Sequence, residues 1–134
     1  MVKSRRVFAI LGAGNMGEGI LASAIEKKVL RADQVRAADP MEDRRRFFAE
    51  KFGVTVTSDN AAAARGADIV LLSVKPQTVH AEAGALAQAV SANCLIISIM
   101  AGIPTATIDG KLGGSRRVIR AMPNLPIRLA AGAT

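Results

Sequence analysis

The feature that most constrains the fold is a glycine pattern near the start of the chain, Gly12-Ala13-Gly14-Asn15-Met16-Gly17. It matches GxGxxG, which is weak by itself because a chain with twelve glycines produces short glycine spacings by chance. Here the pattern directly follows an apolar run at residues 7–11, a predicted buried strand, and precedes a segment with helical apolar spacing. A strand, a glycine turn and a helix in this order are typical of a site for the pyrophosphate of a dinucleotide.

Each glycine of this loop has a separate predicted role. Gly12 permits the tight turn out of the strand, Gly14 lets the backbone approach a pyrophosphate, and Gly17 lets the helix pack closely on the strand. The unpaired amides at the helix amino terminus then face the phosphates. A strand-to-helix turn that binds no ligand is the alternative interpretation. The residues predicted to contact the cofactor here are Leu11, Gly12, Ala13, Gly14, Asn15, Met16 and Gly17.

The rest of the chain alternates short apolar runs with helical patterns. Strands are predicted at residues 7–11, 35–38, 54–57, 69–74, 94–99 and 117–121, with helices between them. The apolar residues are aliphatic, with four Phe and no Trp or Tyr, as suits strands covered by helices on both faces. We therefore expect an α/β Rossmann-type fold, a doubly wound and mainly parallel sheet of about six strands flanked by helices. Length and the lack of a linker indicate a single NAD(P)-binding domain, 1–134.

An acidic residue at the end of the second strand of such a fold normally binds the adenosine ribose. Asp39 stands 22 residues after the last glycine of the loop, near the usual spacing of about 20. A carboxylate there favours NAD and repels the 2′-phosphate of NADP, although Asp39 is also suited to cap a helix with Pro40 in its first turn. Arg44, Arg45 and Arg46 either bind a 2′-phosphate or form a solvated helix face. The sequence leaves NAD(H) and NADP(H) both open, with a slight preference for NAD.

In a doubly wound sheet, ligands bind outside the carboxyl ends of the strands, where the strand order reverses. The fourth strand ends at Ser73-Val74-Lys75-Pro76, so this turn is predicted to face the glycine loop. Lys75 either places a cation near the phosphates or the reacting centre, or reaches solvent. Ala101 and Gly102 are small enough to let a nicotinamide ring approach, and Asn124 is a donor for a carboxamide or a carboxylate. Lys75 and Asn124 are the candidate catalytic residues, and no role is assigned to either.

Composition excludes several other classes of function. The net charge is +7, but Arg5-Arg6, Arg44-Arg45-Arg46 and Arg116-Arg117 lie in separate elements without interleaved aromatic residues, so we expect no nucleic-acid partner. Cys94 and His80 each stand alone, so we expect no disulfide and no metal site, and Cys94 is predicted to be buried. The chain has no apolar run of 18 residues and no signal-peptide pattern, which favours a cytoplasmic protein without a membrane span.

Four segments carry a resemblance to a known family. They are Leu11-Gly12-Ala13-Gly14-Asn15-Met16-Gly17, Val74-Lys75-Pro76-Gln77, Ser98-Ile99-Met100-Ala101-Gly102-Ile103 and Val118-Ile119-Arg120-Ala121-Met122-Pro123-Asn124-Leu125-Pro126. In this order the chain resembles pyrroline-5-carboxylate reductase over nearly its whole length. Many dehydrogenases share the glycine loop, whereas the Val-Lys-Pro-Gln turn and the Arg-x-Met-Pro-Asn-x-Pro stretch are far more specific to this family.

The resemblance implies hydride transfer from NAD(P)H to the imine carbon of Δ1-pyrroline-5-carboxylate, a small cyclic imine carboxylate, in proline biosynthesis. It also implies that Asn60 contacts the adenosine end of the cofactor. Two residues depart from the family pattern. Leu125 replaces the Thr common between the two prolines, and Asp39 stands where many members carry a small polar residue suited to NADP.

Members of this family continue into a helical domain that builds the homo-oligomer and supplies most substrate-binding residues. That domain is not in this chain, so we expect residues 1–134 to bind the cofactor and to reduce the imine poorly or not at all. Two alternatives are a related dehydrogenase of the hydroxyacid or cofactor-to-cofactor type, and a non-catalytic module that senses dinucleotides. The Met122-Pro123-Asn124 stretch argues against the first alternative.

Overall fold

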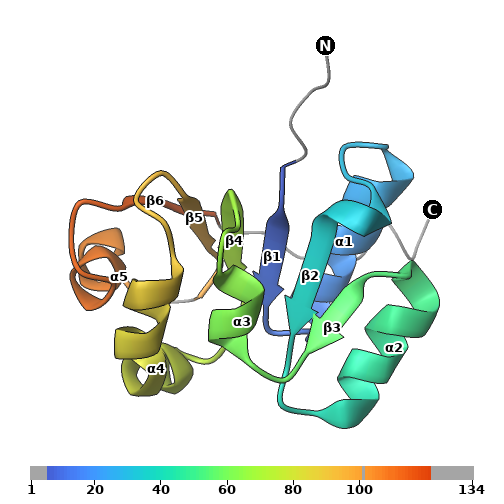
Figure 1. Cartoon of the computed structure of the whole chain (residues 1–134), viewed down its shortest axis with the longest axis horizontal. Helices are drawn as coiled ribbons and strands as arrows, with labels where there is room; N and C mark the ends of the chain where they lie inside the picture. Colours follow the sequence, from blue (N-terminus) through green and yellow to red (C-terminus); the bar gives the residue numbers. More distant parts are fainter. Residues whose placement is uncertain (1–5, 101, 122–134) are drawn as a thin grey trace.

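The chain forms one sheet of six parallel strands in the order β3-β2-β1-β4-β5-β6 (Figure 1). The computed structural model describes residues 6–100 and 102–121. The strands are β1 (Phe8–Leu11), β2 (Val35–Ala38), β3 (Thr55–Thr57), β4 (Ile69–Leu72), β5 (Leu95–Ser98) and β6 (Arg117–Arg120). The helices are α1 (Asn15–Glu26), the 3-10 turn η1 (Ala32–Gln34), α2 (Glu42–Phe52), α3 (Asn60–Ala64), α4 (Pro76–Ala89) and α5 (Thr105–Lys111).

Helices pack on both faces of this sheet. Within β1, Ala9 and Leu11 join the apolar cluster that contains residues of α3, α4 and α5, whereas Ile10 joins the cluster that contains Leu21 of α1 and Phe48 of α2. Neighbouring residues of a strand point to opposite faces, so a strand covered on both faces must be apolar throughout. This explains the continuous apolar run at the start of the chain and confirms the predicted doubly wound α/β fold.

The strand order reverses at β1, which pairs in parallel with β2 on one side and β4 on the other. Leu11, the last residue of β1, is in register with Ala38 of β2 and Leu72 of β4. The carboxyl ends of these three strands therefore lie level at one edge of the sheet, and the turns that follow them surround the point of reversal (Figure 1). Ligands bind at such points in open α/β sheets.

The predicted element boundaries need small corrections. Helix α2 begins at Glu42, so Pro40 is outside the helix and Asp39 is not its cap; instead Asp39 Oδ1 accepts the N–H of Met41 at 2.8 Å in a turn that precedes the helix. Strand β4 ends at Leu72, two residues earlier than predicted, because the chain turns there towards α4. The other predicted strands are the same or longer by one residue at one or both ends.

Cys94 is fully buried immediately before β5, as predicted. Burial is the main cause that raises the pKa of its thiol, so the side chain is a neutral part of the core. No helix within residues 6–100 and 102–121 has the length and apolarity needed to cross a membrane.

An apolar groove runs between α1 and the neighbouring half of the sheet, with a volume of about 410 Å³. Its lining residues are Phe8, Ile20, Ala24, Val29, Leu30, Ile69, Leu71, Ile97, Ile99 and Ala121. At this groove Val29 is 71% exposed, and on the adjoining strand β6 Ile119 is 51% exposed. A parallel sheet normally has both faces covered, so this part of the face is incompletely covered by the described residues.

Candidate functional site

The turn from β1 into α1 has glycines at two positions where the protein itself leaves no room for a side chain. Gly12 has a φ of +105°, and a Cβ there would lie 2.7 Å from the carbonyl carbon of Ser73 and still closer to its oxygen. A Cβ on Gly17 would lie 2.8 Å from the carbonyl oxygen of Gly12. Both glycines are therefore required for the close packing of β1, α1 and the turn after β4.

Gly14 differs from these two glycines because nothing in the described protein requires it. Its backbone is extended, and a Cβ there would meet no atom within 4 Å. Gly14 caps α1 without a side-chain hydrogen bond, and the amides of Asn15, Met16 and Gly17 lie in the first helical turn, where no intrahelical acceptor exists. Open space beside unpaired, positively polarised amides fits a phosphate group.

Ala13, which lies between Gly12 and Gly14, is held on both sides by charged side chains from beyond β2. Asp39 Oδ2 accepts the N–H of Ala13 at 2.8 Å, and Arg44 Nε donates to the carbonyl oxygen of Ala13 at 2.6 Å. A second Arg44 nitrogen donates to Glu18 Oε1 at 3.0 Å. The acidic residue predicted to bind the ribose thus lies against the glycine loop and already orders it.

The three consecutive arginines have separate roles in the structure. Arg44 and Arg45 are half-buried, and both donate to backbone carbonyls. Arg44 binds the carbonyl oxygen of Ala13, and Arg45 binds those of Asp39 and Pro40. Arg46 is exposed and pairs with Glu42 one turn away on the same helix. The interpretation as a solvated helix face is therefore correct for Arg46 alone.

The turn after β4 lies against the glycine loop, as the predicted topology requires. Ser73 donates its backbone N–H to Leu11 at 2.8 Å, and its carbonyl is the group that excludes a side chain at Gly12. Val74 packs against the core, Lys75 is exposed and Pro76 is the first residue of α4. The sequence placed Ser73 in this turn without assigning it a role; its signal is a small polar residue directly after a buried strand.

Beyond β5, the structure describes only part of the predicted nicotinamide side. Ser98 Oγ accepts the N–H of Met100 at 3.2 Å, and both residues are buried. Gly102 is exposed. Ala101 and Asn124 lie outside the described residues.

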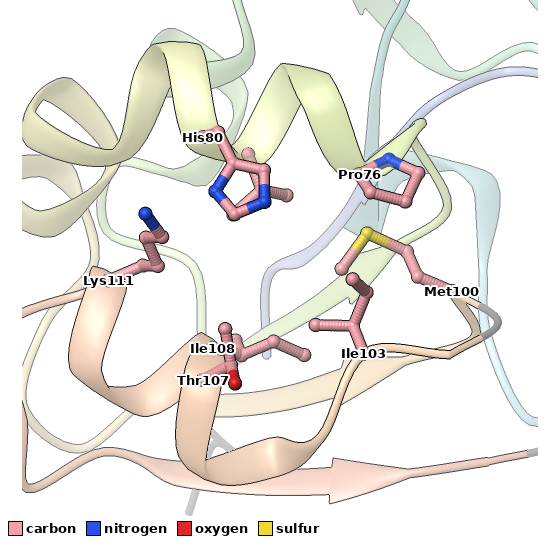
Figure 2. Close-up of a pocket in the computed structure, with 8 residues that line it drawn as sticks. Pro76, His80, Met100, Ile103, Thr107, Ile108 and Lys111 are labelled. Carbon is pink, nitrogen blue, oxygen red and sulfur yellow. The ribbon is translucent and has the colours of Figure 1, made fainter.

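A small pocket adjoins this side, between α4, α5 and the end of β5 (Figure 2). Pro76 and His80 come from α4, and Lys111 comes from α5; Met100 and Ile103 lie near them. The pocket volume is about 10 Å³, which is room for about one water molecule. The pocket is therefore too small to hold a substrate.

Asn60, the residue expected to contact adenosine, is the first residue of α3 and is buried. Its Nδ2 donates to Glu82 Oε1 of α4 at 3.1 Å, but its Oδ1 has no hydrogen-bond partner among the described residues. Buried polar atoms are nearly always paired, so an unpaired oxygen indicates a missing partner. A hydroxyl or amine group of a ligand is a suitable hydrogen-bond donor for this oxygen. The described residues contain no group of three or more His, Cys, Asp or Glu side chains able to hold a metal ion.

Comparisons with known proteins agree with this geometry. Residues 7–102 match the family described as "NADP oxidoreductase coenzyme F420-dependent". The chain belongs to this family. The matched segment contains β1 to β5 and so covers the glycine loop, Asp39 and the turn after β4.

Curated relatives confirm the resemblance noted in the sequence. The chain is 43% identical over 126 residues to the pyrroline-5-carboxylate reductase of Pseudomonas aeruginosa and 33% identical over 124 residues to that of Methanosarcina acetivorans. These alignments cover 94% and 92% of this chain but only 46% of each relative. The chain therefore spans about half the length of the curated relatives it matches.

Solved structures show the same fold. The pyrroline-5-carboxylate reductase of Coxiella burnetii superposes with a TM-score of 0.86 at 31% identity, over 94% of this chain and 47% of that one. The Plasmodium falciparum pyrroline carboxylate reductase, solved with NADP bound, superposes with a TM-score of 0.76 at 20% identity, over 91% of this chain and 44% of that one. At the lower identity the likeness concerns the fold alone.

Proposed function

We propose that this chain is the cofactor-binding part of a pyrroline-5-carboxylate reductase. The whole enzyme would transfer a hydride from NAD(P)H to the imine carbon of Δ1-pyrroline-5-carboxylate and form L-proline. The observation that carries this proposal is the 43% identity to a pyrroline-5-carboxylate reductase across 94% of the chain. The open cradle at Gly14 beside unpaired helix amides supports the cofactor assignment independently.

The residues proposed to hold the dinucleotide surround the reversal point of the sheet. The amides after Gly14 would bind the pyrophosphate, Asp39 would bind the adenosine ribose, and the unpaired oxygen of Asn60 would contact the adenosine end. The turn Val74-Lys75-Pro76 would form the opposite wall. When bound, the reduced nicotinamide supplies the hydride, and the protein supplies orientation and electrostatics.

The reacting end of the proposed site lies beyond the turns that follow β4 and β5. Ala101 and Gly102 would border the nicotinamide ring, and Lys75 and Asn124 remain the candidates for contact with the reacting groups. No described side chain has the paired arrangement of a nucleophile and a base, and hydride transfer does not require one within this domain.

We also infer that the whole protein is a cytoplasmic homo-oligomer whose remaining half supplies most of the substrate site. The length of the curated relatives, of which this chain covers 46%, supports further polypeptide. The incompletely covered apolar groove beside α1 is consistent with a contact to further polypeptide, since large apolar patches mark interaction sites. Light scattering of the protein encoded by the entire reading frame tests the oligomer; a monomer at micromolar concentration would contradict it.

The function is tested by separating cofactor binding from turnover. Nucleotide fluorescence measures the binding of NADH and of NADPH to purified residues 1–134. The same protein is then assayed for reduction of Δ1-pyrroline-5-carboxylate with each of the two nucleotides. We expect saturable binding without turnover, and turnover by the protein encoded by the entire reading frame. Absence of binding to either nucleotide would overturn the cofactor proposal, and steady-state turnover by residues 1–134 alone would overturn the division of labour. Reduction of a 3-oxo acid to the 3-hydroxy acid, in place of reduction of the imine, would favour the hydroxyacid-dehydrogenase alternative.

A further inference from the structure

We propose that Arg44 is a positioning residue for the glycine loop, not a ligand of a 2′-phosphate, and that with Asp39 it makes this domain bind NAD(H) in preference to NADP(H). The proposal rests on the proposed function, because it presumes that the loop binds a dinucleotide. It concerns the three charged residues that hold the loop, which we call the loop clamp: Glu18, Asp39 and Arg44.

The loop clamp fixes the two peptide planes that meet at Ala13, one on each side of its Cα. The N–H of Ala13 donates to Asp39 Oδ2 at 2.8 Å, while the carbonyl oxygen of Ala13 accepts from Arg44 Nε at 2.6 Å. Both bonds are part-buried and involve an ionised partner, which makes them stronger than ordinary backbone bonds. Residue 13 directly precedes Gly14 and the unpaired amides of α1, so its orientation sets the direction in which those amides point.

The guanidinium of Arg44 is held in this position by further contacts. It donates to Glu18 Oε1 at 3.0 Å, and the side chains of Arg44 and Glu18 are 30% and 25% exposed. Its Cζ lies 4.8 Å from the centroid of the Phe47 ring and 5.6 Å from that of Phe48. Such stacking on aromatic rings stabilises a cation and restricts the side chain. Lys51 Nζ approaches the other Glu18 oxygen at 3.4 Å.

A 2′-phosphate would meet the wrong charges beside this clamp. Asp39 presents a carboxylate at the end of β2, where a ribose 2′-hydroxyl is accepted and a phosphate is repelled. For Arg44 to bind that phosphate, it would have to release both the Ala13 carbonyl and Glu18. Arg45 is similarly engaged with the carbonyls of Asp39 and Pro40. NADP(H) would therefore bind only by loosening the loop that holds its own pyrophosphate.

The experiment compares both cofactors in a variant that keeps the packing and removes the charge. Arg44→Met retains an apolar stem over Phe47. Arg46→Met is the matched control, because Arg46 is exposed and pairs with Glu42 on its own helix and not with the loop. Dissociation constants for NADH and NADPH are measured by nucleotide fluorescence on the chain of 134 residues. The wild-type chain should bind NADH the more tightly. In Arg44→Met, both constants should rise by the same factor, about tenfold, as expected for the loss of a charge-assisted hydrogen bond.

Each other outcome contradicts a stated part of the proposal. A weaker affinity of Arg44→Met for NADPH alone would show that Arg44 binds a 2′-phosphate, and unchanged affinities would show that it positions nothing. Wild-type preference for NADPH would overturn the selectivity assigned to Asp39. Binding of neither nucleotide by the wild-type chain would overturn the proposed function itself, which is a different result. The control Arg46→Met should keep both constants within about twofold.

A second variant separates positioning from a general loss of folding. Asp39→Ser removes the carboxylate and leaves a hydroxyl, and the ratio of the NADPH to the NADH dissociation constant should fall about tenfold or more. A purely structural role would change the thermal midpoint without changing this ratio. If Arg44→Met proves unfolded in the absence of cofactor, Glu18→Gln replaces it, because this change keeps an acceptor for Arg44 and removes the opposing charge. The affinities for NADH and NADPH should again fall by the same factor, and this factor should be smaller than in Arg44→Met.

Discussion

The two walls of the proposed cofactor crevice are built differently. On the wall formed by the β1–α1 loop, the backbone is fixed by tight glycine packing against Ser73 and by charged side chains that bind the N–H and the carbonyl oxygen of Ala13. On the wall formed by the ends of β4 and β5, Lys75 is exposed, and its side chain makes no hydrogen bond to another described residue. There the Ser98 hydroxyl accepts the N–H of Met100, and the N–H of Ile99 donates to the carbonyl oxygen of Leu72 at 3.1 Å.

This difference separates two tasks that a dinucleotide enzyme must perform. The wall formed by the β1–α1 loop is held by contacts among the described residues, namely the packing of Gly12 on Ser73 and the bonds of Asp39 and Arg44 to Ala13. On the wall proposed for the nicotinamide side, the candidate residues Ala101 and Asn124 lie outside the described residues, and the described part adjoins a pocket with room for about one water molecule. We therefore expect mutations on the first wall to affect folding or nucleotide affinity strongly, and mutations on the second wall to have smaller effects in this chain.

The largest effect is expected for Gly12→Ala, which tests whether the first wall is fixed by packing. The added Cβ would lie 2.7 Å from the Ser73 carbonyl carbon, at a φ of +105° that L side chains rarely adopt. Overpacking and backbone strain together should lower the free energy of unfolding by about 3 kcal/mol or more. Urea unfolding followed by circular dichroism measures this change. A loss below about 1 kcal/mol would mean that β1 and the turn after β4 are not tightly packed.

Gly14→Ala is the matched test of the same loop and should affect binding alone. Its Cβ would meet no protein atom within 4 Å, so the free energy of unfolding should change by less than about 1 kcal/mol. The methyl group would occupy the space proposed for the pyrophosphate, so affinity for NADH should fall about tenfold or more. Isothermal titration measures the affinity. Unchanged affinity with this variant would place the phosphates elsewhere and break the comparison of the two walls.

The strand order and the location of the crevice were predictable because they depend on local signals. Continuous apolar runs mark buried parallel strands, and the GxGxxG pattern marks the first turn at the reversal point. The cap of α3 depends on a local signal of the same kind: Asp59, which precedes an alanine-rich segment, accepts the N–H of Ala61.

The loop clamp could not be predicted because it depends on distances between residues far apart in sequence. Arg44 and Ala13 are 31 residues apart, and either phosphate or solvent was an equally reasonable partner for a charged side chain on α2. The start of α2 was predicted wrongly for a related reason: the carboxylate of Asp39 binds the N–H groups of Ala13 in the glycine loop and of Met41 in its own turn, and it does not cap the helix. The buried position of Asn60 also requires the packing of α3 on α4.

On the second wall, Ser98→Ala should have an intermediate effect. The change removes the only described side-chain acceptor for the amide of Met100, and both residues are buried. An unpaired buried amide costs about 1 kcal/mol or more, which urea unfolding detects. Nucleotide affinity should fall less than in Gly14→Ala, because Ser98 lies on β5, two strands away from the phosphate-binding loop. An equal fall in affinity would show that the two walls are coupled.

The smallest effect is expected for Lys75→Met, which decides between the two interpretations of this side chain. Lys75 is exposed at the start of α4, so its removal should leave the free energy of unfolding unchanged within about 0.5 kcal/mol. If its cation faces the phosphates across the crevice, affinity for NADH should fall about threefold, and the fall should diminish at high salt because the interaction is screened. Lys27→Met, at the far end of α1, is the control and should change neither property. A salt-independent loss, or no loss, would mean that Lys75 reaches solvent and that the second wall contributes shape without charge.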